Sequence, residues 1–308
     1  MTSLSSGLDY LDLHFLGLKQ VIATAVLHDV GGVALVDPGP TTTLERLKSG
    51  LAARGMTIAD VRALLLTHIH LDHAGVTGHL VRENPKMEVY VHDVGAPHMI
   101  DPSKLLASAA KLYGADMQHL WGEVLPVPAA NVRTLKGGER ITEAGRSLEV
   151  MYTPGHAKHH VSYFDARSGV AFVGDTLGIR RPPGTYVLPP TPPPDIDLAV
   201  WFKSVDHILG WNPETIFITH FGPFDDGRAH ADELIERLRH WATRARSLLR
   251  QADLSDDQRR DTFVGEVLLD LRRRMSPADA EAYDKSGRVD YSWIGLERAI
   301  KKEEAARA

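Results

Sequence analysis

Histidine and aspartate side chains gather in one short segment of the sequence, at a spacing that would allow them to hold a metal ion. Four of them, His68, His70, Asp72 and His73, stand within six residues of one another. Because His68 and His70 are two residues apart, their side chains would face the same side of an extended chain. Imidazole nitrogens and carboxylate oxygens suit zinc and also accept iron or manganese. The segment therefore predicts a metal site.

Three more candidate ligands follow later in the chain, each after an apolar, strand-like run and close to a glycine. They are His156, Asp175 and His220. Functional loops of α/β folds lie at the ends of neighbouring strands. We therefore expect all seven side chains to meet at one edge of the fold. A histidine-rich surface loop without function is the alternative for residues 67–75, and the three later positions make it the weaker interpretation.

The elements that must position these residues alternate between strands and helices over the first two-thirds of the chain. Short runs rich in β-branched and apolar residues predict strands over 21–28, 33–36, 61–66, 87–92, 148–152, 161–164, 170–173 and 216–219. Leucines at helical spacing predict a helix over 41–54, which Gly55 ends. Strands bounded by helices in two successive halves predict an α/β sandwich.

The composition changes twice after these elements. Seven prolines between residues 182 and 194 exclude a helix or an interior strand there and predict a stiff, extended loop. After Gly227 the chain becomes charged and helical, with a capping box formed by Ser255 and Gln258. We therefore predict a main domain with the metal site over residues 1–227 and a helical extension over 228–308. The apolar faces of the extension are expected to cover the rim of the site or to form a homodimer contact, with packing into a tertiary core as the alternative.

The cysteine content, the net charge and the first residues of the chain exclude or disfavour several classes of function. The 308 residues include no cysteine, which excludes disulfides, thiolate ligands and cysteine nucleophiles. The formal net charge of −5 does not favour nucleic acid or a membrane surface as the main partner, so a small-molecule substrate is expected. The first 17 residues contain no lysine or arginine, unlike a secretory signal, and the cytoplasm is the expected location.

The motif H-x-H-x-D-H at 68–73, followed in order by the three later ligands, resembles that of the metallo-β-lactamase fold superfamily, and within it the glyoxalase II-like hydrolases. The resemblance covers about residues 15–225. It implies an αβ/βα four-layer sandwich with a two-metal site at one edge, here followed by the C-terminal helical extension. It also implies the ligand sets: His68, His70 and His156 for one ion, Asp72, His73 and His220 for the other, and Asp175 as the bridge.

The resemblance further implies supporting roles for two residues. Asp37 would hold the metal loop by hydrogen bonding, and a turn-capping role is compatible with this. His160 would support the ligands rather than bind metal itself. Asp72 would have a second, catalytic task, because its free oxygen could orient the nucleophile or accept its proton.

Three residues in the loop after Asp175 are candidates for contact with the substrate. Arg180, Arg181 and Tyr186 could hold an anionic or polar group, since arginine binds a carboxylate through two hydrogen bonds. The alternative, that both arginines are solvated and the tyrosine packs on prolines, is equally compatible with the sequence. The loop does not resemble the glutathione-binding pattern, so the chemistry is expected to be like that of hydroxyacylglutathione hydrolase while the substrate differs.

Taken together, the residues and the resemblance predict a dinuclear metal-dependent hydrolase. A hydroxide shared by two divalent ions would attack a thioester, a lactone or a related small-molecule ester. Zinc is the expected metal, with iron or manganese as alternatives. The alternatives for function are a persulfide dioxygenase-like oxidoreductase with a single iron, a phosphodiesterase or nuclease of the same fold, and a non-catalytic binding protein. The bridging position of Asp175 and the lack of cysteine disfavour β-lactam hydrolysis.

Overall fold

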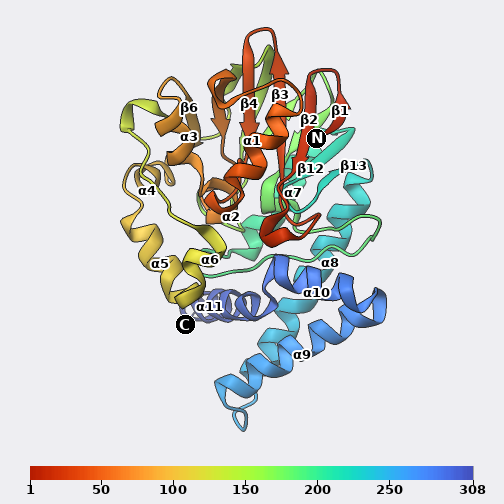
Figure 1. Cartoon of the computed structure of the whole chain (residues 1–308). Coiled ribbons are helices and arrows are strands. Elements are labelled where there is room, and N and C mark those ends of the chain that lie inside the picture. The colour runs from red at the N-terminus through yellow and green to blue at the C-terminus, as the bar shows by residue number, and fades with distance from the viewer. Residues whose placement is uncertain (308) are drawn as a thin grey trace.

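The computed structural model describes residues 1–307, which form two β-sheets packed face to face (Figure 1). The first sheet has seven strands in chain order: β1 (Thr2–Ser5), β2 (Leu8–Asp12), β3 (Ala23–Asp29), β4 (Gly32–Val36), β5 (Val61–Leu65), β6 (Glu88–His92) and β7 (Val132–Leu135). Strands β4 to β7 pair in parallel, so their carboxyl ends reach the same edge of the sheet.

The second sheet has six strands and a different connectivity. Their order is β13 (Gly222–Phe224), β12 (Thr215–Ile218), β11 (Val170–Phe172), β10 (Val161–Asp165), β9 (Arg146–Tyr152) and β8 (Arg140–Glu143). Strands β11 and β12 pair in parallel, and the remaining neighbours are antiparallel. The predicted strands are confirmed to within a few residues, whereas β1, β2, β7, β8 and β13 lie outside the predicted ranges.

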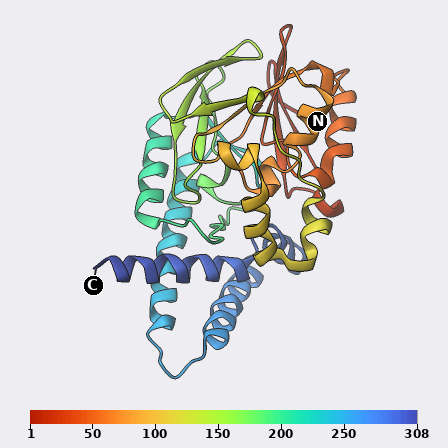
Figure 2. The same ribbon diagram turned by 90° about the vertical axis from the view of Figure 1, so that its left-hand side faces the viewer.

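Helices cover the outer face of each sheet, which completes the four-layer αβ/βα sandwich that the sequence predicted (Figures 1 and 2). Helices α1 (Leu44–Ala52) and α3 (Thr77–Glu83) pack against the first sheet, and α7 (Leu198–Gly210) packs against the second. Strand β3 shows how the layers arise, because Ala25 and Leu27 face the other sheet while Val26 joins the core on the helix side.

Short helices cross the edge of the sandwich where the parallel strands end. They are α2 (Leu71–Ala74), α4 (Ala96–Ile100), α5 (Ser103–Tyr113) and α6 (Met117–Trp121). Helix α5 has no fully buried residue, although its leucines and its tyrosine contact the core in part. This edge is therefore walled by helices and left open between them.

Four helices end the chain and extend below the sandwich (Figure 2), where they share a core with Ile179, Tyr186 and Leu188 of the loop before α7. They are α8 (Gly227–Leu249), α9 (Asp256–Arg274), α10 (Pro277–Gly287) and α11 (Val289–Arg307). The predicted capping box of Ser255 and Gln258 starts α9. Helix α8 contributes Leu234 to the core beneath the second sheet and Trp241 to the core of the extension, so the domain boundary at residue 227 stays a prediction. Within residues 1–307, no helix combines the length and the apolar character that crossing a membrane requires.

Helix α11 lies directly against the proline-rich loop, which runs without a helix or a named strand between residues 180 and 197 as predicted. The Thr191 hydroxyl donates to the backbone carbonyl of Ser292 over 3.1 Å. Gly295 faces the backbone of Thr191 so closely that an added methyl group would collide with the Thr191 carbonyl oxygen. The glycine therefore allows the helix to approach the loop that contributes to the site described below.

Gly295→Ala should lower the free energy of unfolding by about 1–3 kcal/mol, because the new methyl group overpacks this contact. Gly265→Ala is the matched control, since Gly265 lies within α9 and an added methyl group meets no atom within 4 Å. This control should raise stability by about 0.5–1 kcal/mol, the usual gain of alanine over glycine in a helix. Urea denaturation measures both changes, and equal stabilisation by the two variants would contradict the close approach of α11.

Candidate metal centre

All seven candidate ligands meet at one edge of the sandwich, because the strands before them end there. His68 and His70 follow β5, and α2 carries Asp72 and His73. The second sheet contributes the other three ligands after strands β9, β11 and β12, namely His156, Asp175 and His220. Their potential ligand atoms form three groups, and within each group the atoms lie within 4.8 Å of one another: His68, His70 and His156; His68, His73 and Asp175; Asp72, His73 and His220.

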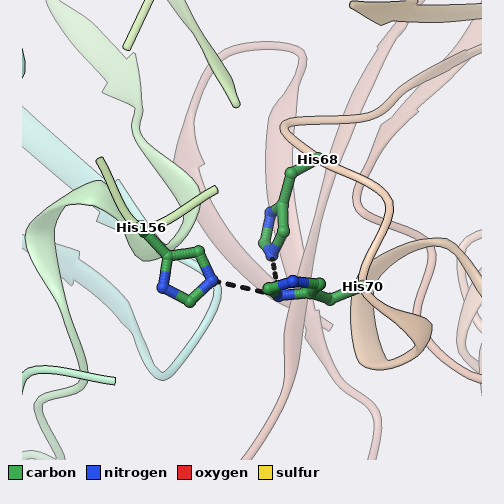
Figure 3. Close-up of side chains that lie close together, drawn as sticks. All are labelled: His68, His70 and His156. Carbon is green, nitrogen blue, oxygen red and sulfur yellow. Dashed lines mark hydrogen bonds between the residues drawn. The ribbon is translucent and has the colours of Figure 1, made fainter. Parts of the chain in front are cut away.

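In the first group three imidazole nitrogens converge on one point (Figure 3). The Nδ1 atom of His70 lies 3.0 Å from His68 Nε2 and 3.0 Å from His156 Nε2. His156 Nδ1 donates to the Pro190 carbonyl over 2.9 Å, which places its proton away from the group. A neutral His156 therefore directs the lone pair of Nε2 inward, as a metal ligand requires.

The second group repeats this arrangement with a carboxylate. His220 Nε2 lies 3.2 Å from Asp72 Oδ2 and 3.2 Å from His73 Nε2. His220 Nδ1 donates to the Val21 carbonyl over 2.8 Å, and His73 Nδ1 donates to Asp37 Oδ2 over 2.8 Å. Both rings thus present Nε2 to the group, and each is oriented by an acceptor behind it.

Asp175 lies between the two groups and reaches both. Its Oδ2 atom is 3.4 Å from His156 Nε2, while its Oδ1 atom is 3.3 Å from His73 Nε2 and 3.5 Å from His220 Nε2. Oδ1 is buried and has no hydrogen bond to any residue in 1–307. A buried carboxylate oxygen without a donor is costly unless a cation neutralises it. The donor set of imidazoles and carboxylates therefore fits divalent metal ions.

The electrostatics of the two groups differ. Burial, together with the neighbouring His156, lowers the pKa of His70 to about 4, and burial and the surrounding histidines hold the pKa of His68 well below its usual range. Burial also opposes the charged form of His73, yet the Asp175, Asp72 and Asp37 carboxylates raise its pKa well above the ordinary value. The histidines of the first group are therefore neutral, whereas nearby carboxylates favour the charged form of His73 in the second.

Asp37, at the end of β4, is the acceptor on which several of these residues converge. Its buried carboxylate accepts from the Thr67 backbone N–H, the Thr67 hydroxyl and His73 Nδ1, each over 2.8 Å, and from the Thr219 hydroxyl over 2.7 Å. The Thr67 hydroxyl donates its proton to Asp37. Its oxygen therefore accepts a hydrogen bond from His68 Nδ1 over 3.0 Å. Asp37 thereby contacts His73 directly and His68 through Thr67.

His160 lies behind the ligands and belongs to none of the three groups. Its Nε2 atom accepts from the Asp175 backbone N–H over 3.2 Å, and its Nδ1 atom contacts the Thr153 hydroxyl at 2.9 Å. Its ring stacks on His68 with centroids 4.9 Å apart. The structure therefore places His160 where it can orient Asp175 and His68.

Several residues of the site escaped the analysis of the sequence. Thr67 and Thr219 stand directly before His68 and His220, and this shared position was a signal that could have identified them. The carbonyl groups of Val21 and Pro190 carry no such signal, because any residue type supplies a carbonyl. His159 is buried beside His68, with parallel rings 6.1 Å apart, and it also lines the cleft described next.

A cleft of about 1350 Å³ opens above the ligands, and His70, Asp72, His156, Asp175 and His220 all line it. Helices α5 and α11 contribute to its walls, and the proline-rich loop contributes residues 190 and 192–194. The C-terminal extension thus reaches the rim of the site through α11, while the apolar faces of α8 and α9 pack into tertiary cores, which was the alternative. A molecule in this cleft would contact the ligand groups directly.

The structure does not bring Arg180, Arg181 and Tyr186 to the cleft. Arg180 forms an ion pair with Asp226 at 2.7 Å, and Arg181 donates to the Lys19 and Gln20 carbonyls. The ring of Tyr186 is buried beneath the Arg237 guanidinium and beside Tyr283. All three side chains are engaged elsewhere, so we do not propose them as substrate contacts.

Comparison with known proteins agrees with this geometry. One relative is the metallo-beta-lactamase fold-containing protein ST1585 of Sulfurisphaera tokodaii, 29% identical over 52% of this chain and 60% of its own length. A hydroxyacylglutathione hydrolase of Aeromonas hydrophila is 33% identical over 46% of this chain and 41% of its own length. The matched segment thus spans about half the length of these curated relatives.

The fold as a whole has a counterpart among solved structures. The metallo-beta-lactamase family protein TTHA1429 of Thermus thermophilus superposes with a TM-score of 0.68 at 24% identity, covering 98% of this chain and 96% of that one. The family model of the metallo-beta-lactamase superfamily matches residues 16–220, which include all seven candidate ligands. With this match, the four-layer fold and the ligand groups at its edge, the chain belongs to the metallo-beta-lactamase superfamily.

Proposed function

We propose that this chain is a dinuclear metal-dependent hydrolase that cleaves an ester-type bond in a small molecule, such as a thioester or a lactone. The observation that carries the proposal is the position of Asp175, whose two oxygens face two separate ligand groups at the floor of the cleft. Similarity to hydroxyacylglutathione hydrolases over about half of their length supports the choice of bond.

His68, His70 and His156 would hold one ion, Asp72, His73 and His220 would hold the other, and Asp175 would contact both. Bound divalent ions would lower the pKa of water and polarise the carbonyl group of an ester. Asp72 is the ligand carboxylate open to the cleft, with 23% of its side chain exposed against 5% for Asp175. It is therefore placed to orient a water molecule or accept its proton.

The alternatives receive less support from the site. A mononuclear iron oxidoreductase needs only one metal site, so the second group of Asp72, His73 and His220 would bind no ion. A phosphodiesterase or nuclease of the same fold remains the second candidate, and the activity test below includes its substrates.

Zinc is the proposed metal because imidazole and carboxylate ligands suit it, and the same ligands are compatible with iron and manganese. Action in the cytoplasm, the absence of nucleic-acid and membrane partners, and a homodimer stay predictions.

Asp175→Asn tests the proposal, because the amide keeps the size of the side chain but cannot bridge two cations as a carboxylate does. We expect a loss of more than about 100-fold in the hydrolysis of a responsive thioester or lactone, and a loss of bound metal. The assay is a panel of thioesters, lactones, aryl esters and phosphodiesters with zinc-loaded protein.

Asp195→Asn is the matched control for Asp175→Asn, since Asp195 lines the same cleft but pairs with Lys158 at 3.0 Å. It should retain its metal and most of its activity. Hydrolysis of phosphodiesters alone would replace the proposed bond with the second candidate. Full esterase activity in Asp175→Asn, with undiminished metal, would contradict the bridging role.

Asp37→Asn should weaken zinc binding by about 10- to 100-fold, the usual cost of removing a group that orients a metal ligand. The amide offers one acceptor oxygen in place of two, and it directs an N–H₂ group toward donors that now point at Asp37. Competition with a chelator measures the zinc affinity. Asp29→Asn, at the exposed turn between β3 and β4, is the control. Equal zinc affinity of the two variants would show that Asp37 does not orient the ligands.

A further inference from the structure

One aromatic residue in the wall of the cleft has a role that the metal centre does not explain. Tyr113 is the last residue of α5 and lines the same cleft as the candidate ligands. Its ring lies edge-on to Trp121, with centroids 5.0 Å apart, and edge-on to Tyr291 of α11, with centroids 5.4 Å apart. Two elements far apart in the sequence therefore hold this side chain in place.

Helix α11 also holds the backbone next to Tyr113. The Tyr291 hydroxyl donates to the Leu112 carbonyl over 2.9 Å, which ties the end of α5 to the C-terminal extension. A ring packed between two others and anchored through its neighbour loses little conformational freedom when a ligand binds. Tyr113 is thus oriented in advance for whatever its hydroxyl contacts.

The hydroxyl group of Tyr113 makes no hydrogen bond to any of residues 1–307, in contrast to that of Tyr291. Burial and the negative charge of Asp72 raise the pKa of Tyr113 above its ordinary value, so the phenol keeps its proton at neutral pH. A protonated phenol without a protein partner is a hydrogen-bond donor available to a ligand.

The cleft that Tyr113 lines combines apolar side chains with charged residues of the C-terminal extension, such as Arg288, whose guanidinium lies over the Tyr291 ring. Phe15 stacks on Trp121 with centroids 5.5 Å apart. Leu16 and Ile294 also line the cleft, yet 42% and 38% of their respective surfaces are exposed. Exposed apolar side chains in a concave site that also holds polar groups are typical of a pocket for a ligand with an apolar arm and an acceptor atom.

We propose that Tyr113 is a specificity-determining residue for esters with an alkyl or aryl arm. Its hydroxyl donates a hydrogen bond to an oxygen of the ester group, and the exposed side chains of Leu16 and Ile294 receive the apolar arm. This inference rests on the proposed hydrolase function, because it assigns the substrate class of the same cleft. It also gives the C-terminal extension a task, which is to hold Tyr113 against the cleft.

Tyr113→Phe tests the inference, since the variant keeps the packed ring and removes only the hydroxyl. Octanoate serves as the probe of binding, because it has an apolar arm and acceptor oxygens, and equilibrium dialysis against zinc-loaded protein measures its Kd. We expect the Kd to rise about 10-fold, the effect of one lost hydrogen bond to a charged group. The KM for an octanoyl thioester should rise by a similar factor, with kcat reduced less.

Tyr90→Phe is the control, because its hydroxyl contacts Glu88 and Glu143 and Tyr90 does not line the cleft. It should leave both the Kd and the KM unchanged. Equal octanoate affinity of wild type and Tyr113→Phe would overturn the inference. So would hydrolysis of acetyl thioesters by a wild-type protein that does not bind octanoate, and this result would leave the proposed function intact. If octanoate binding depends on Tyr113 but the protein hydrolyses no ester, the proposed function would be wrong, while the role of Tyr113 in binding the ligand would stand.

Discussion

The buried carboxylate of Asp37 joins the elements from which the metal ligands emerge. It accepts hydrogen bonds from Thr67 after β5, from His73 in α2 and from Thr219 after β12, so one side chain connects both sheets at the edge of the sandwich. Hydrogen bonds to a charged acceptor are stronger than those between neutral groups. The convergence of ligands from separate strands depends on this one group, because each partner either is a ligand or directly precedes one.

The C-terminal extension supports the site from the opposite side. Helix α11 contacts Thr191 through Ser292, and the preceding residue, Pro190, accepts the hydrogen bond that orients His156. The same helix holds the end of α5 through Tyr291. A helix that contacts both a ligand-bearing loop and the wall of the cleft couples the folding of the extension to the shape of the site. The extension therefore both lines the cleft and helps to hold the segments that carry the ligands and the cleft wall.

The sequence revealed those parts of the structure that rest on local patterns. The ligands stand directly after apolar runs, and parallel or adjacent strands bring such positions to one edge, so the site could be located before the fold was known. Strands β1 and β2 were missed because Thr2–Ser5 and Leu8–Asp12 are short and carry polar residues. Strand β2 forms by pairing with β3, and β1 forms by pairing with β2, so both depend on partner strands rather than on their own residue pattern.

Contacts between distant segments account for the remaining differences. Arg180 could have faced a substrate, but Asp226, which follows 46 residues later, pairs with it instead. The interaction of Leu112 with Tyr291 spans 179 residues, and nothing in the local sequence of α5 indicates it. The chemistry of a site can therefore be predicted from ligand types and spacing, whereas its substrate-binding walls depend on tertiary contacts.

The central claim is that the seven ligands hold two metal ions bridged by Asp175. A crystal structure of the zinc-loaded protein, with anomalous differences measured on both sides of the zinc absorption edge, tests it most directly. We expect two anomalous peaks, one among His68, His70 and His156 and one among Asp72, His73 and His220, with an oxygen of Asp175 coordinating each ion. A single peak in fully loaded protein, or two peaks without coordination by Asp175, would contradict it.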